Sequence, residues 1–319
     1  MFDPEIENMK SRIDLRAYAA GQGYALDKRQ SWRGSAVMRH PNGDKIIIKL
    51  NEADGHYTYC SVRDDTDNGT IIDFVQRRLR LNLGRIRQEL RPWLGESPVK
   101  VPVFPPLRPV SRDRMRVENE YNKMKDAHRH PYLENERALA ASLFELPRFV
   151  GRIRIDARGN AIFPHWDLDG LCGFEIKNSG FTGFSPGGTK GLWLSHEFPE
   201  DNRLVICESA IDALSHAVLM PDEQARYASI GGKPNPIQPE LIRAAALRMP
   251  PKSKIVAAMD ADEDGGKLAE VVREAVLNSG RDDLSFVFEE PEGAKDWNDV
   301  LRAKPSIKSG YRPDVPSVA

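Results

Sequence analysis

Residues 254–267 place a short apolar run directly before an acidic one. The run at 255–259 is rich in β-branched residues, which predicts a buried strand, and helical periodicity begins at Leu268. Between them three carboxylates fall within five residues, followed by two glycines: Asp260, Asp262, Asp264, Gly265 and Gly266. Ligands of open α/β sheets bind outside the carboxyl ends of the strands. Carboxylates this close repel one another unless a cation lies between them, and hard oxygen ligands favour Mg²⁺, Mn²⁺ or Ca²⁺.

Two simpler interpretations compete with a metal site. A run of acidic residues is often a solvated turn. The spacing of Asp260, Asp262, Asp264 and Gly265 also fits the first half of an EF-hand loop. However, an EF-hand needs a glutamate where this chain has Val271, and it needs a helix rather than a strand before the loop.

Length and composition limit the classes of protein. The chain has 319 residues, enough for about two domains. No apolar run approaches the roughly 18 residues of a membrane span, and the first residues lack the pattern of a signal peptide. The three cysteines, Cys60, Cys172 and Cys207, form no CxxC pair and suggest no disulfide framework. We therefore expect a cytoplasmic protein with no membrane partner.

Charge is unevenly distributed although the formal net charge is only −1. Residues 77–129 hold fourteen Lys and Arg against six Asp and Glu, whereas residues 260–299 hold four against thirteen. A basic region together with an acidic pocket suits a metal enzyme that acts on a polyanion. The alternative is that the basic run is only the solvated face of a helix.

The first 95 residues predict a small α+β domain. A helix is expected over 3–22, then an antiparallel meander with strands at 35–39, 45–50 and 56–62, and a helix opening after Gly69. This order, with Tyr57-Thr-Tyr-Cys60 and Ile72-Asp73-Phe74-Val75, resembles the zinc-binding domain at the front of bacterial replicative primases. A zinc site needs four Cys or His ligands, and only Cys60, His40 and His56 are at hand, so we expect that zinc has been lost.

Arginines interleaved with apolar residues follow over 74–93. Such a pattern suits single-stranded nucleic acid, with arginines on phosphates and Trp93 stacking on bases. The predicted phosphate contacts are Arg77, Arg78, Arg85 and Arg87. Prolines then crowd residues 96–111, which predicts an extended linker and a domain boundary.

Residues 112–200 predict helices followed by β-hairpins, with turns at Gly159 and Gly170. The hairpin segment resembles the β-rich region before the catalytic domain of primases, and more closely a domain that precedes Toprim domains in plasmid and mobile-element proteins. That resemblance implies that Lys177 and Lys190 face the nucleic acid or the phosphates of a nucleotide. Surface lysines on a hairpin are an equally open interpretation.

Strand and helix then alternate over 201–303, which predicts a parallel sheet covered by helices. A strand at 203–207 ends in Glu208, and Asp212 lies one helical turn later, so both carboxylates can face one point. This pattern, followed by Asp-x-Asp-x-x-Gly at 260–265, resembles the Toprim signature of primases, topoisomerases and nucleases. No tyrosine stands in a suitable context for a topoisomerase.

The Toprim resemblance implies a role for each acidic residue. Asp260 and Asp262 would hold Mg²⁺ or Mn²⁺, with Asp212 in support and Asp296 or Asp299 as candidates for a second ion. Glu208 would be the general acid or base.

The sequence thus predicts an α/β protein with a C-terminal Toprim domain after small α+β domains and a flexible tail at 304–319. It indicates a primase-like nucleotidyltransferase of a plasmid or mobile element that uses single-stranded DNA and nucleoside triphosphates, with a helicase or relaxase as candidate partner. A Toprim nuclease and a non-catalytic nucleic-acid-binding protein remain the alternatives.

Overall fold

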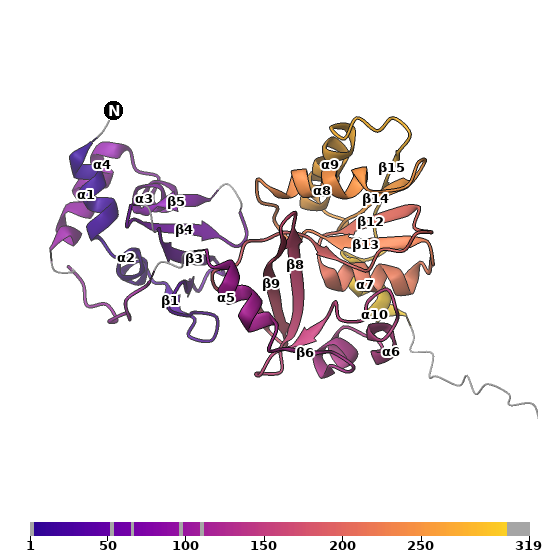
Figure 1. Ribbon diagram of the computed structural model, residues 1–319. Helices are drawn as coiled ribbons and strands as arrows, with labels where there is room; N and C mark the ends of the chain where they lie inside the picture. The colour runs from indigo at the N-terminus through magenta and orange to yellow at the C-terminus, as the bar shows by residue number, and fades with distance from the viewer. Residues whose placement is uncertain (1–2, 52–53, 65–66, 96–97, 109–111, 305–319) are drawn as a thin grey trace, which may run out of the picture. The chain divides into compact units, whose positions relative to one another are not determined.

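The computed structural model describes residues 3–51, 54–64, 67–95, 98–108 and 112–304 (Figure 1). The chain forms two compact units, Met1–Ser111 and Arg112–Ala319. The tail expected at 304–319 lies, from residue 305 onward, outside the described residues. No helix in the described part of the chain is long and apolar enough to cross a membrane.

The N-terminal unit packs helices against a five-stranded antiparallel sheet of order β1-β2-β3-β4-β5. Its helices are α1 Pro4–Arg12, α2 Leu15–Gly21, α3 Ile71–Leu79, α4 Leu83–Leu90 and the 3-10 helix η1 Arg91–Leu94. Its strands are β1 Ala25–Leu26, β2 Ala36–Arg39, β3 Lys45–Leu50, β4 Tyr57–Ser61 and β5 Asn68–Thr70. The predicted meander is therefore present, with Ile46 and Ile48 of β3 fully buried.

The single helix expected over 3–22 is in fact two helices. Ile13 has an extended backbone, and the side chain of Asp14 accepts a hydrogen bond from the backbone N–H of Arg16 at 2.9 Å. An N-cap of this kind starts a new helix, because it satisfies a donor that has no partner within the helix. Periodicity alone missed the break, since the apolar residues of both helices face the same core.

The Pro-rich segment packs on the N-terminal unit. Leu107 is buried in the apolar core of this unit, and Phe104 lies against the same core. The backbone N–H of Arg108 donates to the carbonyl of Arg33 at 2.8 Å. The first compact unit accordingly extends through this segment, to residue 111.

Two residues expected to contact nucleic acid are used inside the N-terminal unit instead. The Arg78 guanidinium makes ion pairs with Asp44 at 2.8 Å and Asp67 at 2.6 Å, and donates to the Tyr24 hydroxyl at 2.9 Å. Trp93 is only 9% exposed and packs against Tyr18 at 5.0 Å between ring centroids. The expectation that Trp93 stacks on bases is therefore wrong, because its ring faces belong to the core.

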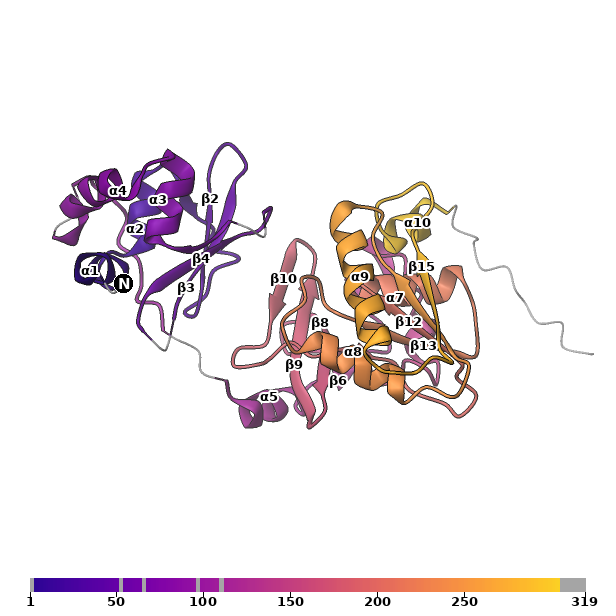
Figure 2. The ribbon, with the colours of Figure 1, turned by 90° about the horizontal axis from the view of Figure 1, so that it is seen from above.

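The C-terminal unit begins with helix α5 Arg114–Tyr121 and an antiparallel sheet of order β10-β9-β8-β7-β6. The strands are β6 Lys125–Asp126, β7 Arg154–Ile155, β8 Ala161–Asp167, β9 Gly170–Asn178 and β10 Phe181–Phe184. The π-helix η2 Tyr132–Glu136 and helix α6 Ala141–Phe144 separate β6 from β7. Helix α5 lies along β9 (Figure 2), where Val117 and Tyr121 pack on Ile162 and Phe174.

A second sheet of the C-terminal unit has the order β11-β13-β12-β14-β15, parallel except for β11. Its strands are β11 Trp193–Leu194, β12 Arg203–Cys207, β13 Ala225–Ser229, β14 Lys254–Ala258 and β15 Ser285–Glu289. Its helices are α7 Ala210–Leu219, α8 Gln238–Leu247, α9 Glu263–Leu277 and α10 Trp297–Ala303. Figure 1 shows α8 and α9 on one face of the sheet and α7 and α10 on the other.

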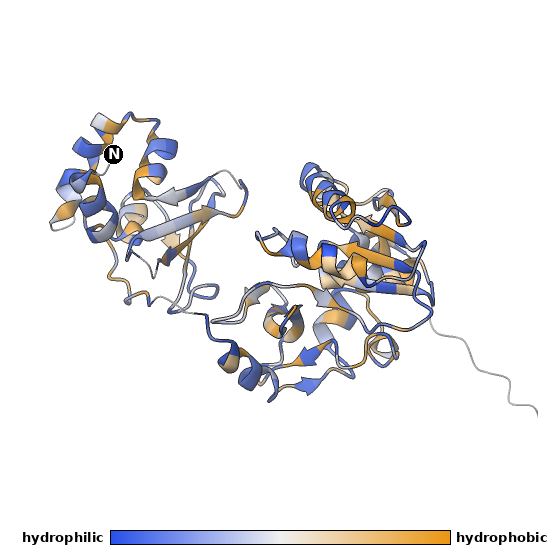
Figure 3. Ribbon diagram, turned by 45° about the horizontal axis from the view of Figure 1, so that its top comes forward, coloured by the Kyte–Doolittle hydropathy of each residue, from blue (hydrophilic) through white to orange (hydrophobic). Residues whose placement is uncertain are grey.

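Both faces of this parallel sheet are buried. Val205 and Cys207 of β12 enter the core beneath α7 and α10, whereas Leu204 and Ile206 enter the core beneath α8 and α9. The strands therefore read as continuous apolar runs (Figure 3), as expected for a sheet covered on both sides. Phe163 of the antiparallel sheet shares the first of these cores, so the two sheets form one compact body.

The Arg78 network generates a prediction about stability. Arg78→Gln leaves Asp44 without this cation and Asp67 with only Arg77 at 3.8 Å, and removing one partner of a largely buried pair costs roughly 3 kcal/mol. The free energy of unfolding of the N-terminal unit, measured by denaturant titration, should fall accordingly. Arg85→Gln, at an exposed position of α4, is the control and should change it by less than about 0.5 kcal/mol. Equal effects of the two changes would contradict the structural role of Arg78.

Candidate active site

The strand register brings the acidic residues together. Cys207 at the end of β12 pairs with Ala258 at the end of β14, so the residues that follow both strands emerge at the same edge of the sheet. Glu208 follows β12, and its backbone carbonyl accepts hydrogen bonds from the N–H groups of Gly231 at 2.8 Å and Gly232 at 3.0 Å. Asp260 follows β14 and is 8% exposed. Two acidic corners 52 residues apart in sequence thus become neighbours.

The turn after β14 explains the glycine of the acidic motif. A Cβ atom at Gly265 would lie 2.0 Å from the backbone carbonyl oxygen of Asp260, which is closer than any side chain can approach. Asp262 caps helix α9 by accepting a hydrogen bond from the N–H of Gly265 at 2.9 Å. The same carboxylate makes an ion pair with Lys295 at 3.1 Å. The absence of a side chain at 265 therefore lets α9 begin immediately after Asp260.

Helix α10 fixes the orientation of Asp212. The Asp212 carboxylate accepts hydrogen bonds from the Ser209 hydroxyl at 2.5 Å and from the backbone N–H of Asn298 at 3.2 Å. Asn298 is almost fully buried, and its amide donates to the carbonyl of Arg137 at 2.8 Å and to the Ser215 hydroxyl at 2.9 Å. Asn298 therefore joins α7, α10 and the segment after η2 at the point where Asp212 faces the site.

Four of the predicted acidic residues line one pocket of about 210 Å³: Glu208, Asp212, Asp260 and Asp296. Two basic side chains, Arg137 and Lys177, line the same pocket, together with Tyr132 and Thr182. The carboxylates come from the parallel sheet and its helices, whereas Lys177 and Thr182 come from β9 and β10. The site thus combines carboxylates with two cations, Lys177 from the antiparallel sheet and Arg137 from the segment after η2.

The carboxylates raise one another's affinity for protons. Burial and the negative charges of Glu208 and Asp212 raise the pKa of Asp260 to about 8. Burial raises the pKa of Asp212 to about 6, and Asp296 adds to the increase. Burial, Asp212 and Asp262 raise the pKa of Glu208 above its usual range. At neutral pH without a metal ion, Asp260 therefore holds a proton that a bound cation would displace.

The donor chemistry of this pocket fits a hard divalent cation. The Oδ1 atom of Asp260 is buried without a hydrogen-bond partner, and the surrounding donors are carboxylate oxygens. Within the described residues no group of three or more His, Cys, Asp or Glu side chains is arranged to hold a metal ion. Mg²⁺ commonly binds proteins through one or two carboxylates, with waters and substrate phosphates as its other ligands.

The remaining predicted site residues do not line this pocket, and Asp262 is among them, because its carboxylate caps α9 and pairs with Lys295. Asp299 pairs with Arg302 at 3.0 Å along α10 and does not line the pocket. The ammonium of Lys190 donates to the carbonyl of Lys233 at 2.9 Å. Arg87 pairs with Asp3, Arg78 with Asp44 and Asp67, and Arg77 lies 3.8 Å from Asp67.

Sequence reasoning missed Arg137, Tyr132, Thr182 and Asn298 as pocket residues. Arg137 follows η2 in a segment that was expected to be a regular helix, and no local pattern marks it as part of a site. Asn298 stood inside a recognisable acidic motif. Its role, however, depends on contacts with Ser215, which precedes it by 83 positions, and with Arg137, which precedes it by 161 positions. Only the fold brings these residues to the carboxylates.

A buried ion network holds Lys177 in place. Lys177 pairs at 3.3 Å with Glu175, which is 4% exposed, and the Nδ1 atom of the buried His165 lies 2.8 Å from the carbonyl oxygen of Gly191. Although burial alone would raise it, the charges of Lys177 and His165 lower the pKa of Glu175 to about 2. Glu175 is therefore an anion that keeps the ammonium of Lys177 beside the acidic pocket.

Comparisons with known proteins match two parts of the chain. Residues 205–301 match a family described as Toprim-like, and residues 131–202 match a family described as a protein of unknown function, DUF3991. No curated protein matches the chain. The Toprim-like match covers β14, α9 and the acidic pocket residues Glu208, Asp212, Asp260 and Asp296.

Two solved structures are similar over part of their length. The primase fragment of the bacteriophage T7 primase-helicase protein is 16% identical, over 56% of this chain and 70% of that one, with a TM-score of 0.37. A DNA primase domain from Pseudomonas aeruginosa is 22% identical, over 47% of this chain and 49% of that one, with a TM-score of 0.34.

The raised pKa of Asp260 predicts a specific dependence of stability on pH. In metal-free protein the folded state holds this proton up to about pH 8, whereas the unfolded chain releases it near its ordinary value of 3.8. Stability should therefore fall as pH rises from about 4 to 8, and level off above. Asp260→Asn removes this titrating group. As pH rises, the free energy of unfolding of the wild type should therefore fall relative to that of the variant, by up to about 1.4 kcal/mol per pH unit.

Denaturant titrations in EDTA at several pH values measure this difference. Glu263→Gln is the control. Glu263 is the exposed first residue of α9, directly after the acidic loop, and its replacement should leave the pH dependence unchanged. A constant difference between wild type and Asp260→Asn across pH 4–8 would show that Asp260 does not carry the predicted proton.

Proposed function

We propose that this chain, in which residues 205–301 form a Toprim-like domain, is a metal-dependent enzyme that acts on nucleic acid by nucleotidyl transfer. The observation that carries the proposal is the pocket in which four carboxylates face Arg137 and Lys177. Phosphoryl transfer needs negative ligands for a metal ion next to positive groups for phosphate oxygens. A solvated acidic turn would leave its carboxylates exposed, whereas Asp212 and Asp260 are 7% and 8% exposed.

Each residue has a distinct task in the proposed reaction. Asp260 and Asp262 would hold Mg²⁺ or Mn²⁺, with Asp296 as the candidate for a second ion; zinc is not part of the proposal. A bound divalent ion supplies charge neutralisation at the phosphate and a lower pKa for the attacking oxygen. Glu208, whose pKa is raised by burial and by Asp212 and Asp262, is suited to accept and return a proton.

The basic side chains of the pocket would orient the phosphates. Lys177 is 16% exposed, and its contact with Glu175 restricts its movement. Arg137 is held by the Tyr132 hydroxyl at 2.9 Å from its Nε atom, which leaves the planar guanidinium in a defined orientation. Orientation of a phosphate in this way lowers the barrier because less freedom is lost during the reaction.

The finer proposal is primer synthesis on single-stranded DNA from nucleoside triphosphates. Its support is the primase-like order of sequence motifs, in which a front domain without a complete zinc ligand set precedes β-hairpins and a Toprim-like domain. A cytoplasmic protein of a plasmid or mobile element, working with a replicative helicase or a relaxase, fits the same order of motifs. Exposed arginines of the N-terminal unit, among them Arg85, would add phosphate contacts.

A nuclease is the second candidate, because the same pocket serves equally well for an attacking water. A template, labelled nucleoside triphosphates and Mg²⁺ or Mn²⁺ in one reaction separate the two: longer products indicate synthesis and shorter template indicates cleavage. Absence of both with stable nucleic-acid binding would instead favour a non-catalytic binding protein.

Two substitutions test the catalytic assignment. Asp262→Asn keeps an N-cap for α9, because asparagine caps helices as well as aspartate, but removes ligand charge. Glu208→Gln removes the proton acceptor. Each should lower the turnover rate by at least about a hundredfold. The melting temperature in EDTA should stay the same or rise for Glu208→Gln, whereas Asp262→Asn loses the ion pair with Lys295 and should lower it slightly. An active Asp262→Asn protein would contradict the assigned metal site.

The salt dependence of binding tests the phosphate contacts. Replacing Arg77 and Arg85 together with glutamine should flatten the slope of log affinity for single-stranded DNA against log salt concentration by up to about 1.4, if each touches one phosphate. Glu208→Gln should leave this slope unchanged, because Glu208 acts on the reacting oxygen. An unaltered slope in the double variant would show the arginines to be an ordinary solvated face, and would move the search to Lys177.

A further inference from the structure

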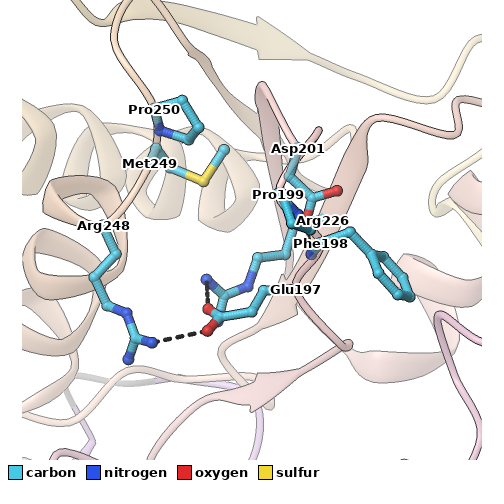
Figure 4. Close-up of a pocket in the computed structure, with 8 residues that line it drawn as sticks. All are labelled: Glu197, Phe198, Pro199, Asp201, Arg226, Arg248, Met249 and Pro250. Carbon is cyan, nitrogen blue, oxygen red and sulfur yellow. Dashed lines mark hydrogen bonds and ion pairs between the residues drawn. The ribbon is translucent and has the colours of Figure 1, made fainter.

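A second pocket lies at the opposite edge of the parallel sheet from the carboxylates. It is formed where the chain enters β12, β13 and β14, so it opens at the amino ends of these strands (Figure 4). Its volume is about 480 Å³, within the range of binding sites for small ligands and side chains. Its lining residues are Glu197, Phe198, Pro199, Asp201, Arg226, Arg248, Met249 and Pro250.

Two arginines converge on one carboxylate in this pocket. Glu197 accepts from Arg226 Nη1 at 2.8 Å and from Arg248 Nη2 at 2.9 Å, as Figure 4 shows. Arg226 is 7% exposed, and its Nε atom is buried without a hydrogen-bond partner. Asp201 does not compensate, because both of its oxygens are bound by the Arg148 guanidinium at 2.8 and 2.6 Å. The two arginines therefore share a single carboxylate.

Burial makes this arrangement unfavourable for Arg226. Burial lowers the pKa of Arg226, and the charge of Arg248 adds to the decrease while Glu197 opposes it. The side chain of Glu197 is 51% exposed, so it can move into solvent, but the buried Arg226 then needs another carboxylate in its place. A carboxylate from outside could then take its place between the two guanidinium groups, which bind carboxylates through paired N–H donors.

The rest of the pocket is apolar. Phe198, Pro199, Met249 and Pro250 form its wall, and Phe198 is 37% exposed, with Arg148 4.4 Å from its ring centroid. An apolar wall beside an arginine pair is a surface for two neighbouring groups of a ligand, one anionic and one hydrophobic. A bare ion would leave this wall in contact with water.

We propose that this pocket binds an acidic peptide segment of a partner protein. A glutamate or aspartate of the segment replaces Glu197 between Arg226 and Arg248, and an adjacent apolar side chain packs on Phe198 and Met249. A carboxylate presents two oxygens in the geometry that Glu197 now places between Arg226 and Arg248, so it can take over both ion pairs.

The position of the pocket suits recruitment. The amino ends of the strands are the edge furthest from Glu208 and Asp260, so a bound segment leaves the acidic pocket open. The proposal needs no catalytic activity at that pocket, and it is tested without nucleic acid or metal.

The test uses two fluorescein-labelled hexapeptides that differ at one position. One carries a glutamate between a phenylalanine and a leucine, and the matched probe has glutamine in place of that glutamate. Fluorescence anisotropy with the full chain should show that the glutamate peptide binds and the glutamine peptide binds at least about tenfold more weakly. Glu197→Gln should strengthen binding of the glutamate peptide by about tenfold, because it removes the competing carboxylate. Arg248→Gln, at a side chain 66% exposed, should fold normally and weaken binding by about fivefold or more.

The control is Arg243→Gln on α8, whose arginine pairs with Glu240 on the surface and should leave peptide binding unchanged. Equal binding of both peptides to the Glu197→Gln protein, or no effect of Arg248→Gln, would overturn the proposal. Competition by inorganic phosphate or ATP at lower concentrations than by the glutamate peptide would also overturn it, and would assign the pocket to a phosphate ligand.

Discussion

The burial of Glu208, Asp212 and Asp260 at one edge of the parallel sheet is the constraint on which the candidate site depends. Their raised pKa values express first the cost of burying these carboxyl groups and second the repulsion from neighbouring carboxylates. The parallel register of β12 and β14 provides that constraint, since a one-residue slip would turn alternate side chains toward the opposite face. Both faces of the sheet are packed against helices. A slip of β12 against β14 would leave as many carboxylates buried as before and would lose apolar contacts on both faces.

Several secondary contacts then fix where each carboxylate points. Gly265 permits α9 to start against the backbone of Asp260, and Asn298 donates its N–H to Asp212 from a helix that follows much later in the chain. Lys177 is supplied by the antiparallel sheet, and the buried anion of Glu175 keeps it there. The two sheets of the C-terminal unit consequently act together at the pocket: the parallel sheet presents acidic groups, and the antiparallel sheet presents the cation of Lys177. Their common core, which includes Phe163 and Val205, keeps these opposite charges in place.

The sequence revealed the acidic site because its determinants are local. An apolar run that ends in Glu208, and another that ends in Asp260, can be read within about ten residues each, and parallel strands must place such ends together. Arg137 and Thr182 could not be found in this way, because their position depends on how η2 and β10 pack on a different sheet. The basic run of the N-terminal unit could be read only in part for the same reason. Charge in sequence does not show which arginines face carboxylates, and Arg78 and Arg87 both do.

The two edges of the parallel sheet carry opposite excess charge. At the carboxyl edge, acidic residues outnumber the cations that line their pocket, whereas at the amino edge Arg226 and Arg248 share one half-exposed carboxylate. The strand dipoles do not produce this difference, since sheets have only small net dipoles, so it comes from the side chains placed at the strand ends. A cation at one edge and an anion at the other would each relieve repulsion between like charges. β12 and β14 contribute to both edges, so any coupling between a ligand at one edge and a ligand at the other has to pass through this sheet. Only if the strands stay rigid should the stabilisation from the two ligands add independently.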